Sequence, residues 1–223
     1  MNFQGRGQIA RLLLVYTKTN FTEKLYSFSK MNEWVEDKNT LGLDFPSMPY
    51  LIDGKFKLTE SRAIEKYILH RAKKTEILGR NNKERAFIDN IDGVLRDIFS
   101  GIIGLLSAPD FEESRKKLFE TVEQKLNYLN SCIGGKDYLL GRLTYVDFVL
   151  NVVYGYFRLF YPHEYSKWGK IERVYQNVNE LPQVAAYYKS SEGISALLPS
   201  EWASNPKFIN IRPLSELIEE VSI

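Results

Sequence analysis

Two short clusters between residues 47 and 61 have the residue types and spacing that could bind a small peptide. Ser47, Met48 and Pro49 stand directly before a predicted strand. Proline has no N–H to give to a sheet, so it marks a strand edge or a sharp turn into the strand. If the Met48–Pro49 bond is cis, Met48 presents its N–H and C=O outward, where an extended peptide could pair with them. The alternative is an ordinary loop proline.

The second cluster is Glu60 and Ser61, directly before a predicted helix. Ser61 is the predicted N-cap of that helix, and capping alone would explain a serine there. A helix N-terminus also attracts a carboxylate through its free N–H groups and its dipole. Glu60 could bind an ammonium group. A carboxylate and an ammonium on one carbon describe the γ-glutamyl end of glutathione, which is therefore the candidate ligand.

Charge and histidine content argue against two other kinds of site. The 30 basic residues are scattered among 28 acidic ones, which leaves a net charge of +2 and no sustained basic stripe for a nucleic acid. His70 and His163 lie far apart in the sequence and match no zinc or haem pattern. We expect no nucleic-acid partner, no metal site and no bound cofactor.

Cysteine usage and hydropathy predict a cytoplasmic protein. Cys132 is the single cysteine, so the chain can form no internal disulfide and suits a reducing compartment. No apolar run approaches the roughly 20 residues of a membrane span, and the N-terminus has no secretory apolar region. We expect no membrane attachment.

The first 75 residues alternate between helix and strand patterns. Residues 9–16 follow a helical spacing, 23–28 form a predicted short strand, and 50–59 form two strands around a tight turn at Asp53-Gly54. A helix follows from Ser61. The positions expected to face the core are Ile9, Leu12, Leu13, Tyr16, Ile64, Tyr67 and Ile68.

After a charged linker that ends at Gly79, strand patterns nearly vanish. Four stripes of apolar residues recur at three- and four-residue spacing, which is typical of helices that face a bundle core. Each stripe could instead be a partner-binding face, but the core interpretation is favoured. Thr144 and Asp147 form a capping box for the third helix. The stripes are Ile88, Ile91, Leu95, Ile98 and Ile102; Leu118, Val122, Leu126 and Leu129; Val146, Val149, Leu150, Val153 and Phe157; and Ile171, Val174, Tyr175 and Val178.

The run LGLDFPSMPYLIDGKFKLTESRAI, residues 41–64, resembles the cytosolic glutathione transferases, and most closely their mu class. The similarity continues through GQIARLLLVYT, APDFEE and LTYVDF and covers roughly residues 4 to 200. It implies a thioredoxin-like glutathione-binding domain over residues 1–73. An all-helical domain over residues 80–223 would carry the pocket for the electrophile. The implied reaction is conjugation of glutathione, a co-substrate, to small hydrophobic electrophiles in detoxification.

The resemblance also assigns roles to residues that contact glutathione. Trp34 and Lys38 match the tryptophan and lysine that hold the glycyl carboxylate. Met48 matches the residue whose backbone pairs with glutathione, and Pro49 matches the cis-proline. Ser61 matches the serine at the γ-glutamyl carboxylate.

Three further positions carry implied roles. Glu60 replaces the glutamine of the mu class, but glutamate-serine is common in other classes and suits an ammonium group. Asp97 matches an aspartate that reaches the γ-glutamyl group bound by the neighbouring subunit. Phe45 matches an aromatic side chain that fits between helices of the partner, which implies a homodimer.

The chain departs from the mu pattern at several positions of the site. Ser47 replaces an asparagine, and Met31 stands where that class has an arginine for the glycyl end, although Lys30 is adjacent. Ser107 replaces a tyrosine that often overhangs the electrophile pocket, which puts assistance from that position in doubt.

The largest departure is at the N-terminus. Mu-class chains open with a strand that ends in Tyr-Trp-Asp, and the alignment puts Met1 at the tryptophan and Asn2 at the aspartate. The catalytic tyrosine would precede the first residue, and residues 1–5 contain no tyrosine, serine or cysteine to replace it. We therefore assign no catalytic residue. A truncated gene model is favoured over an authentic protein without the tyrosine and its strand, which would lie between residues 23–28 and 50–53.

Three functions stay open at this point. The leading one is a glutathione transferase. The others are a non-catalytic binding or interaction protein with the same fold, and a glutathione-dependent isomerase. A thioredoxin-type redox role is disfavoured because the sequence has no C-x-x-C motif. Beyond residue 205, the spacing of Leu214, Leu217, Ile218 and Val221 predicts a short amphipathic helix that either packs over the pocket or frays.

Overall fold

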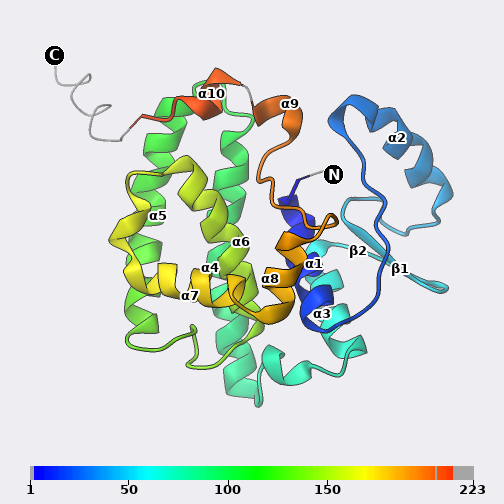
Figure 1. The fold of residues 1–223 in the computed structure, drawn as a ribbon, viewed down its shortest axis with the longest axis horizontal. Helices are drawn as coiled ribbons and strands as arrows, with labels where there is room; N and C mark the ends of the chain where they lie inside the picture. Colours follow the sequence, from blue (N-terminus) through cyan, green and yellow to red (C-terminus); the bar gives the residue numbers. More distant parts are fainter. Residues whose placement is uncertain (1–2, 204, 213–223) are drawn as a thin grey trace. The chain divides into compact units, whose positions relative to one another are not determined.

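The computed structural model describes residues 3–203 and 205–212, and the chain divides into two units (Figure 1). The first unit is Met1–Leu78 with Leu181–Ala203, and the second is Gly79–Glu180 with Ser204–Ile223. The predicted helix around Leu214 to Val221 lies outside the described residues. Within the described part of the chain, no helix combines the length and apolarity that a bilayer crossing needs.

The first unit is built around α1 (Gln8–Tyr16) and α3 (Ser61–Arg71), which pack against each other. Of the seven apolar positions predicted to face its core, the aliphatic ones are buried, while Tyr16 and Tyr67 are half-buried. The described part of the unit also contains short 3-10 helices. They are η1 (Gly5–Gly7), η2 (Phe28–Lys30) and η3 (Thr75–Leu78).

A two-stranded antiparallel sheet, β1 (Tyr50–Asp53) and β2 (Phe56–Thr59), precedes α3. Its register pairs Tyr50 with Thr59 and Asp53 with Phe56, so the turn is Gly54-Lys55. Gly54 has φ +60°, a conformation that glycine adopts without the steric cost of a side chain. The predicted hairpin is confirmed.

The strand predicted at residues 23–28 is wrong. Residues 21–27 form an irregular segment with no sheet pairing, and η2 begins at Phe28. The segment still has a strand-like sequence, and Tyr26 is buried. A strand exists only when a neighbour supplies a hydrogen-bonded ladder, and none of the described segments does so here.

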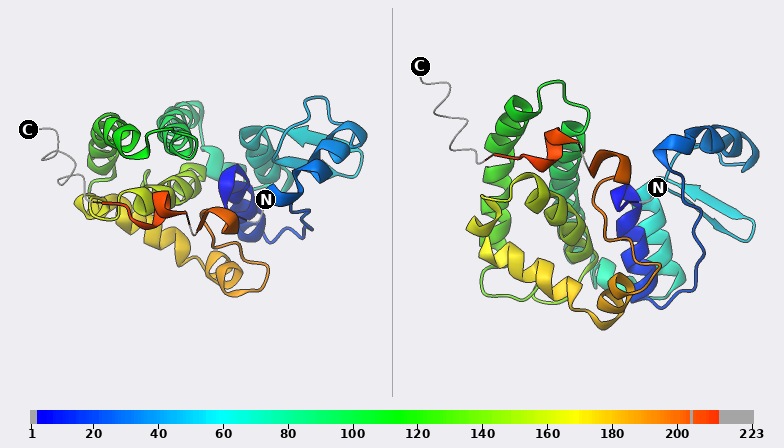
Figure 2. Two further views of the ribbon diagram at one scale, coloured as in Figure 1. Left: turned by 90° about the horizontal axis from the view of Figure 1, so that it is seen from above. Right: turned by 45° about the horizontal axis from the view of Figure 1, so that its top comes forward.

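A later segment of the chain completes the first unit. The helix α8 (Pro182–Lys189) packs on α1, and the short α9 (Ser200–Ala203) follows (Figure 2). The Gln4 amide donates to the Ala196 carbonyl at 2.8 Å, and Gln8 Nε2 donates to the Ile194 carbonyl at 3.3 Å. Contacts thus group 181–203 with the first unit, whereas the predicted boundaries placed these residues in the helical domain. Those boundaries stay a prediction.

The second unit is a bundle of four helices: α4 (Asn82–Leu105), α5 (Phe111–Ile133), α6 (Tyr145–Phe160) and α7 (Gly169–Asn179). The helix α6 packs on both α4 and α7 and is buried without interruption over residues 145–157. The short η4 (Tyr165–Lys167) and α10 (Pro206–Ile209) complete the unit. The predicted stripes face the core, except that Leu118 and Tyr175 are only half-buried.

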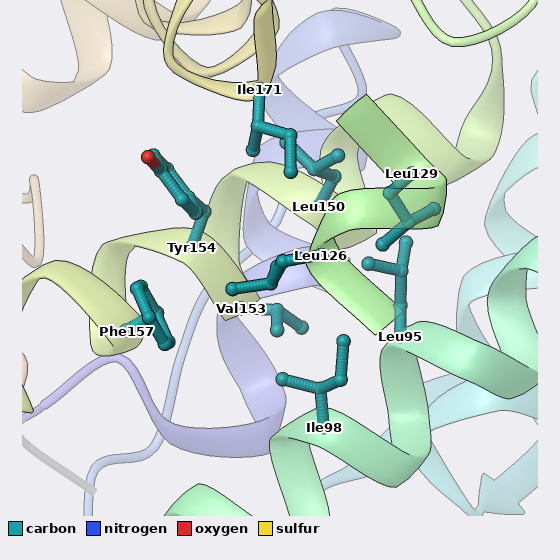
Figure 3. A pocket seen from close by; sticks show the side chains of 9 residues that line it. All are labelled: Leu95, Ile98, Leu126, Leu129, Leu150, Val153, Tyr154, Phe157 and Ile171. Atoms are coloured by element: carbon teal, nitrogen blue, oxygen red, sulfur yellow. The ribbon is translucent and has the colours of Figure 1, made fainter. Parts of the chain in front are cut away.

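A small gap remains among the four helices of the bundle (Figure 3). It offers about 10 Å³, roughly the space of one water molecule. Its lining is apolar apart from Tyr154, whose hydroxyl donates to the Tyr165 carbonyl at 2.7 Å. The gap is therefore a packing defect of the core and has no room for an organic electrophile. Its lining residues are Leu95, Ile98, Leu126, Leu129, Leu150, Val153, Tyr154, Phe157 and Ile171.

The predicted capping box at the start of α6 is present. Thr144 is the N-cap, and its hydroxyl and its amide both donate to Asp147 Oδ2 at 2.7 Å. The other carboxylate oxygen, Oδ1, accepts from the Leu139 amide at 2.8 Å. Thr144 and Asp147 are fully buried. One carboxylate therefore joins the loop before α6 to the helix itself.

Candidate glutathione-binding site

The hairpin register brings two of the predicted clusters to the same end of the sheet. Tyr50 pairs with Thr59, so Pro49, which precedes β1, and Glu60, which follows β2, both adjoin this pair of residues. Met48 and Ser61 lie one residue further out on either side. Residues separated by more than ten positions in the sequence therefore flank one site.

Met48 leaves its backbone open to a ligand. The Met48–Pro49 bond is cis, as the sequence analysis considered. Within the described residues, neither the amide nor the carbonyl of Met48 has a hydrogen-bond partner, and the residue is half-buried. A half-buried amide and carbonyl need water or a ligand as a partner. An extended peptide could pair with both groups at once.

The N-terminus of α3 differs by one residue from the prediction. The N-cap is Glu60, and Ser61 is the first helical residue. The first intrahelical bond runs from the Ile64 amide to the Glu60 carbonyl at 3.0 Å, so α3 offers no internal acceptor to the amides before Ile64. The Glu60 side chain makes no capping bond and is exposed. This end of the helix can therefore present amides, a hydroxyl and a carboxylate to a ligand.

Glu60 also has an unusual backbone conformation, with φ +66° and ψ +110°. A residue with a side chain pays roughly 1–3 kcal/mol to occupy such a region, and such strain is concentrated at functional sites. Thr59 before it is buried and paired in the sheet, and Ile64 after it is buried in the core. The packing on both sides thus holds Glu60 in this backbone conformation at the N-terminus of α3, where the residue is exposed.

Trp34 and Lys38 lie on α2 (Met31–Thr40), one turn apart and hence on one face. Trp34 is 9% exposed and forms a buried cluster with Tyr26 and Leu43, against which Met48 packs. Its indole N–H has no partner within the described residues, and the same is true of the half-buried Lys38 ammonium. Both donors are available to an anionic ligand group. The stacking of Trp34 on Tyr50, the first residue of β1, joins this face to the hairpin end.

The structure gives a packing role to Met31, one of the departures from the mu pattern. Met31 packs on the Trp34 cluster. Lys30 pairs with Glu33 at 3.6 Å, and both side chains are largely exposed. Met31 thus serves packing, while Lys30 forms a weak surface ion pair.

Asp97 and Phe45 have no role that is visible in one chain. Asp97 lies on α4 of the second unit, is 69% exposed, and accepts from Lys125 Nζ at 2.9 Å. Phe45 lies on the loop between α2 and β1 and is 75% exposed. Met1 and Asn2 lie outside the described residues. Among the residues that the structure describes, no three carboxylate, imidazole or thiol groups gather into a metal site.

Sequence reasoning missed the side chains that support α2. Tyr26 OH donates to Asp37 Oδ2 at 2.7 Å and lies 3.1 Å from Tyr50 OH. The Lys24 ammonium pairs with the same Asp37 oxygen. Tyr50 also stacks on Trp34, with ring centroids 5.9 Å apart. The sequence analysis predicted a short strand over residues 23–28 but assigned no role to Tyr26 or Asp37.

Comparisons with known proteins agree with both units. Residues 2–70 match the glutathione S-transferase N-terminal domain, and residues 96–191 match its C-terminal domain. The chain is 32% identical to glutathione S-transferase Mu 1 of Bos taurus over 196 residues, which cover 85% of this chain and 88% of that protein. It is 32% identical to glutathione S-transferase Mu 5 of Homo sapiens over 203 residues, which cover 88% and 92%.

A solved structure supports the same conclusion. The crystal structure of the glutathione S-transferase Blo t 8 superimposes with a TM-score of 0.75 at 30% identity, over 88% of this chain and 94% of that one. The predicted fold class, a thioredoxin-like domain followed by an all-helical domain, is confirmed. The chain belongs to the glutathione S-transferase family, and mu-class members are among its relatives.

Proposed function

We propose that this protein binds reduced glutathione and transfers it to small hydrophobic electrophiles in the cytoplasm. The observation that carries the proposal is the hairpin register, which puts the open backbone of Met48 and the N-terminus of α3 at one end of the sheet. The family names of its relatives support the same ligand. Pre-formed groups of this kind reduce the ordering that binding would otherwise require.

Each part of glutathione has a matching group. The γ-glutamyl carboxylate meets the hydroxyl of Ser61 and the amides at the start of α3, and the γ-glutamyl ammonium meets Glu60. The cysteinyl amide and carbonyl pair with Met48, next to Pro49. The glycyl carboxylate meets Lys38 and the indole N–H of Trp34.

The reaction is the attack of the glutathione thiolate on an electrophilic carbon. With an aryl halide, the sulfur forms the new C–S bond and the halide leaves with the electron pair of the broken bond. The thiol proton goes to solvent. A helical-domain pocket for the electrophile is part of the proposal, and the gap in the bundle core is too small to be that pocket.

Replacing Ser61 by alanine is expected to weaken glutathione binding by about 1–3 kcal/mol, because a charged carboxylate then lacks one hydrogen bond. Isothermal titration calorimetry at neutral pH measures the change. Ser131→Ala, at an exposed position on α5, is the control and should leave affinity unchanged. An unchanged affinity for Ser61→Ala would remove Ser61 from the site. Binding without turnover of any electrophile would favour a non-catalytic binding protein or an isomerase.

We further propose a two-fold homodimer in which Phe45 inserts into the partner and Asp97 reaches the partner's γ-glutamyl site. An aromatic side chain that is 75% exposed on a loop is suited to burial in an interface. Phe45→Ser should raise the monomer fraction in sedimentation velocity at micromolar concentration. Phe21→Ser, at an aromatic residue that is 38% exposed, is the control and should leave the dimer intact. A monomeric wild type would refute the proposal.

A further inference from the structure

The helix α2 carries two of the ligand groups yet stands apart from the main packing of its unit. Figures 1 and 2 show it on the same side of the unit as the hairpin, away from α1 and α3. Trp34 is its buried residue, within a small apolar cluster. A short helix with one buried anchor depends on additional bonds for its orientation. The precision with which α2 presents Trp34 and Lys38 must come from those bonds.

Tyr26 supplies the central bond. It is 2% exposed, and its hydroxyl donates to Asp37 Oδ2 at 2.7 Å. The same hydroxyl lies 3.1 Å from that of Tyr50 on β1, so it also accepts a hydrogen bond from Tyr50. The ring of Tyr26 meets Trp34 edge-on, with centroids 5.5 Å apart. Tyr26 thus connects the strand, the irregular segment and two positions of α2.

At neutral pH, Tyr26 and Asp37 have the protonation states that their hydrogen bond requires. Burial raises the pKa of the Tyr26 phenol, with further contributions from Tyr50 and Asp37, so the hydroxyl keeps its proton. The Lys24 ammonium and then the Tyr26 hydroxyl lower the pKa of Asp37, so its carboxylate stays ionised. A charge-assisted hydrogen bond between these groups therefore persists throughout the neutral range.

Asp37 is the residue directly before Lys38, and it lies nearly one turn beyond Trp34. Any rotation or shift of α2 that breaks the Tyr26–Asp37 bond also moves the two ligand groups. Within the proposed glutathione-binding function, we infer that Tyr26 is a positioning residue: it holds α2 so that Lys38 and Trp34 bind the glycyl carboxylate of glutathione, without touching the ligand itself.

The test compares Tyr26→Phe with the wild type on two ligands. One is glutathione, and the other is its glycyl monoethyl ester, which keeps every group except the glycyl charge. Tyr26→Phe should raise the dissociation constant of glutathione about fivefold, the effect of weakening one charged contact. It should change that of the ester less than about twofold, because the ester has no carboxylate for α2 to bind.

Tyr67→Phe is a matched control. Tyr67 OH also donates to an aspartate, Asp53 Oδ2, at 2.8 Å, but this pair joins β1 to α3 and does not involve α2. Tyr67→Phe should therefore change the dissociation constants of the two ligands by the same factor. A second variant, Asp37→Asn, keeps the side-chain shape and weakens the same connection, so Tyr26→Phe added to Asp37→Asn should cause little further loss.

The outcomes separate this inference from the proposed function. If wild-type protein binds neither ligand at millimolar concentration, the proposed function fails and the inference fails with it. If the wild type binds glutathione but Tyr26→Phe changes both ligands equally, or neither, the inference alone is overturned. Circular dichroism of each variant verifies that it is folded, and Asp37→Asn provides the same comparison if Tyr26→Phe does not fold.

Discussion

Extending the polypeptide by a strand that ends in Tyr-Trp directly before Asn2 is expected to raise its rate of conjugation of an aryl halide on the order of 30-fold at neutral pH. The tyrosine would donate a hydrogen bond to the glutathione sulfur. A free thiol with a pKa of about 8.5 is only a few per cent ionised at pH 7, whereas a pKa of about 6.5 makes most of it thiolate. The pH–rate profile of the extended protein should shift downward by about two pH units.

The same extension is expected to stabilise the first unit. Within the described residues, β1 pairs only with β2, and residues 21–27 pair with no strand. Phe21, Leu25 and Ile52 are exposed there, at 38%, 41% and 45%. A new strand between them would gain two ladders of backbone hydrogen bonds and cover apolar surface. The melting temperature should rise, and proteolysis near residues 23 to 30 should slow.

An extension with phenylalanine in place of the tyrosine separates the two effects. It should restore stability and protease resistance but leave the rate low and the apparent pKa near that of free glutathione. If the 223-residue polypeptide already conjugates an aryl halide with an apparent pKa near 6.5, another donor serves the thiol. The alignment of Met1 and Asn2 with the family pattern would then be wrong.

The helical part of the fold was predictable because its information is local. On a helix, residues three and four positions apart share a face, so the stripe from Ile88 to Ile102 indicates both the helix and its buried side. Asp53-Gly54 likewise indicates a hairpin, because few residues other than glycine accept the φ of +60° found at Gly54. Leu118 is only half-buried, and the neighbouring Phe119 faces the core instead. Only the first position of that stripe was therefore misplaced by one residue, whereas Val122, Leu126 and Leu129 are buried as predicted.

Features that depend on a distant partner were not predictable in the same way. The segment from 23 to 28 resembles a short strand in composition, but a strand needs a neighbour that its own sequence does not contain. The return of residues 181–203 to the first unit depends on contacts such as Gln4 with Ala196, far apart in the sequence. Helix ends are uncertain by a residue because caps depend on backbone geometry, which explains why Glu60 rather than Ser61 is the N-cap.

The site was predictable only through the resemblance to a family. The charge logic at Glu60 and Ser61 pointed to an amino acid-like ligand, but Trp34, Lys38 and Asp97 follow no local pattern and were assigned by resemblance. The Tyr26–Asp37 bond escaped because it joins an irregular segment to a half-buried aspartate on α2, and neither residue belongs to an apolar stripe. Positioning residues of this kind require coordinates.

Replacing Asp147 by alanine is expected to lower the free energy of unfolding by about 3 kcal/mol at neutral pH. The change removes the acceptor of three buried donors: the Leu139 amide, the Thr144 amide and the Thr144 hydroxyl. Unsatisfied buried donors cost about 1–3 kcal/mol each, and relief from burying the charge offsets part of the sum. Urea denaturation, with the helical signal at 222 nm, measures the loss.

The contribution of Asp147 to the free energy of unfolding should also depend on pH. Burial raises the pKa of Asp147 to about 6, against the hydrogen bonds from Leu139 and Thr144, which lower it. The folded protein therefore holds this proton more tightly than the unfolded chain, in which the pKa is about 4. The stabilisation is fully present below about pH 4 and disappears as the pH rises to about 6, a change on the order of 3 kcal/mol.

Asp147→Asn isolates this titration from that of the other carboxylates. Its amide oxygen still accepts a hydrogen bond, so the variant keeps part of the cap, but it has no proton to release. The unfolding free energy of the wild type minus that of Asp147→Asn should therefore fall between pH 4 and pH 6 and stay constant above pH 6. If the wild type instead gained stability relative to Asp147→Asn over this range, Asp147 would have a lowered pKa in the folded protein. The three hydrogen bonds to its carboxylate would then outweigh the cost of its burial.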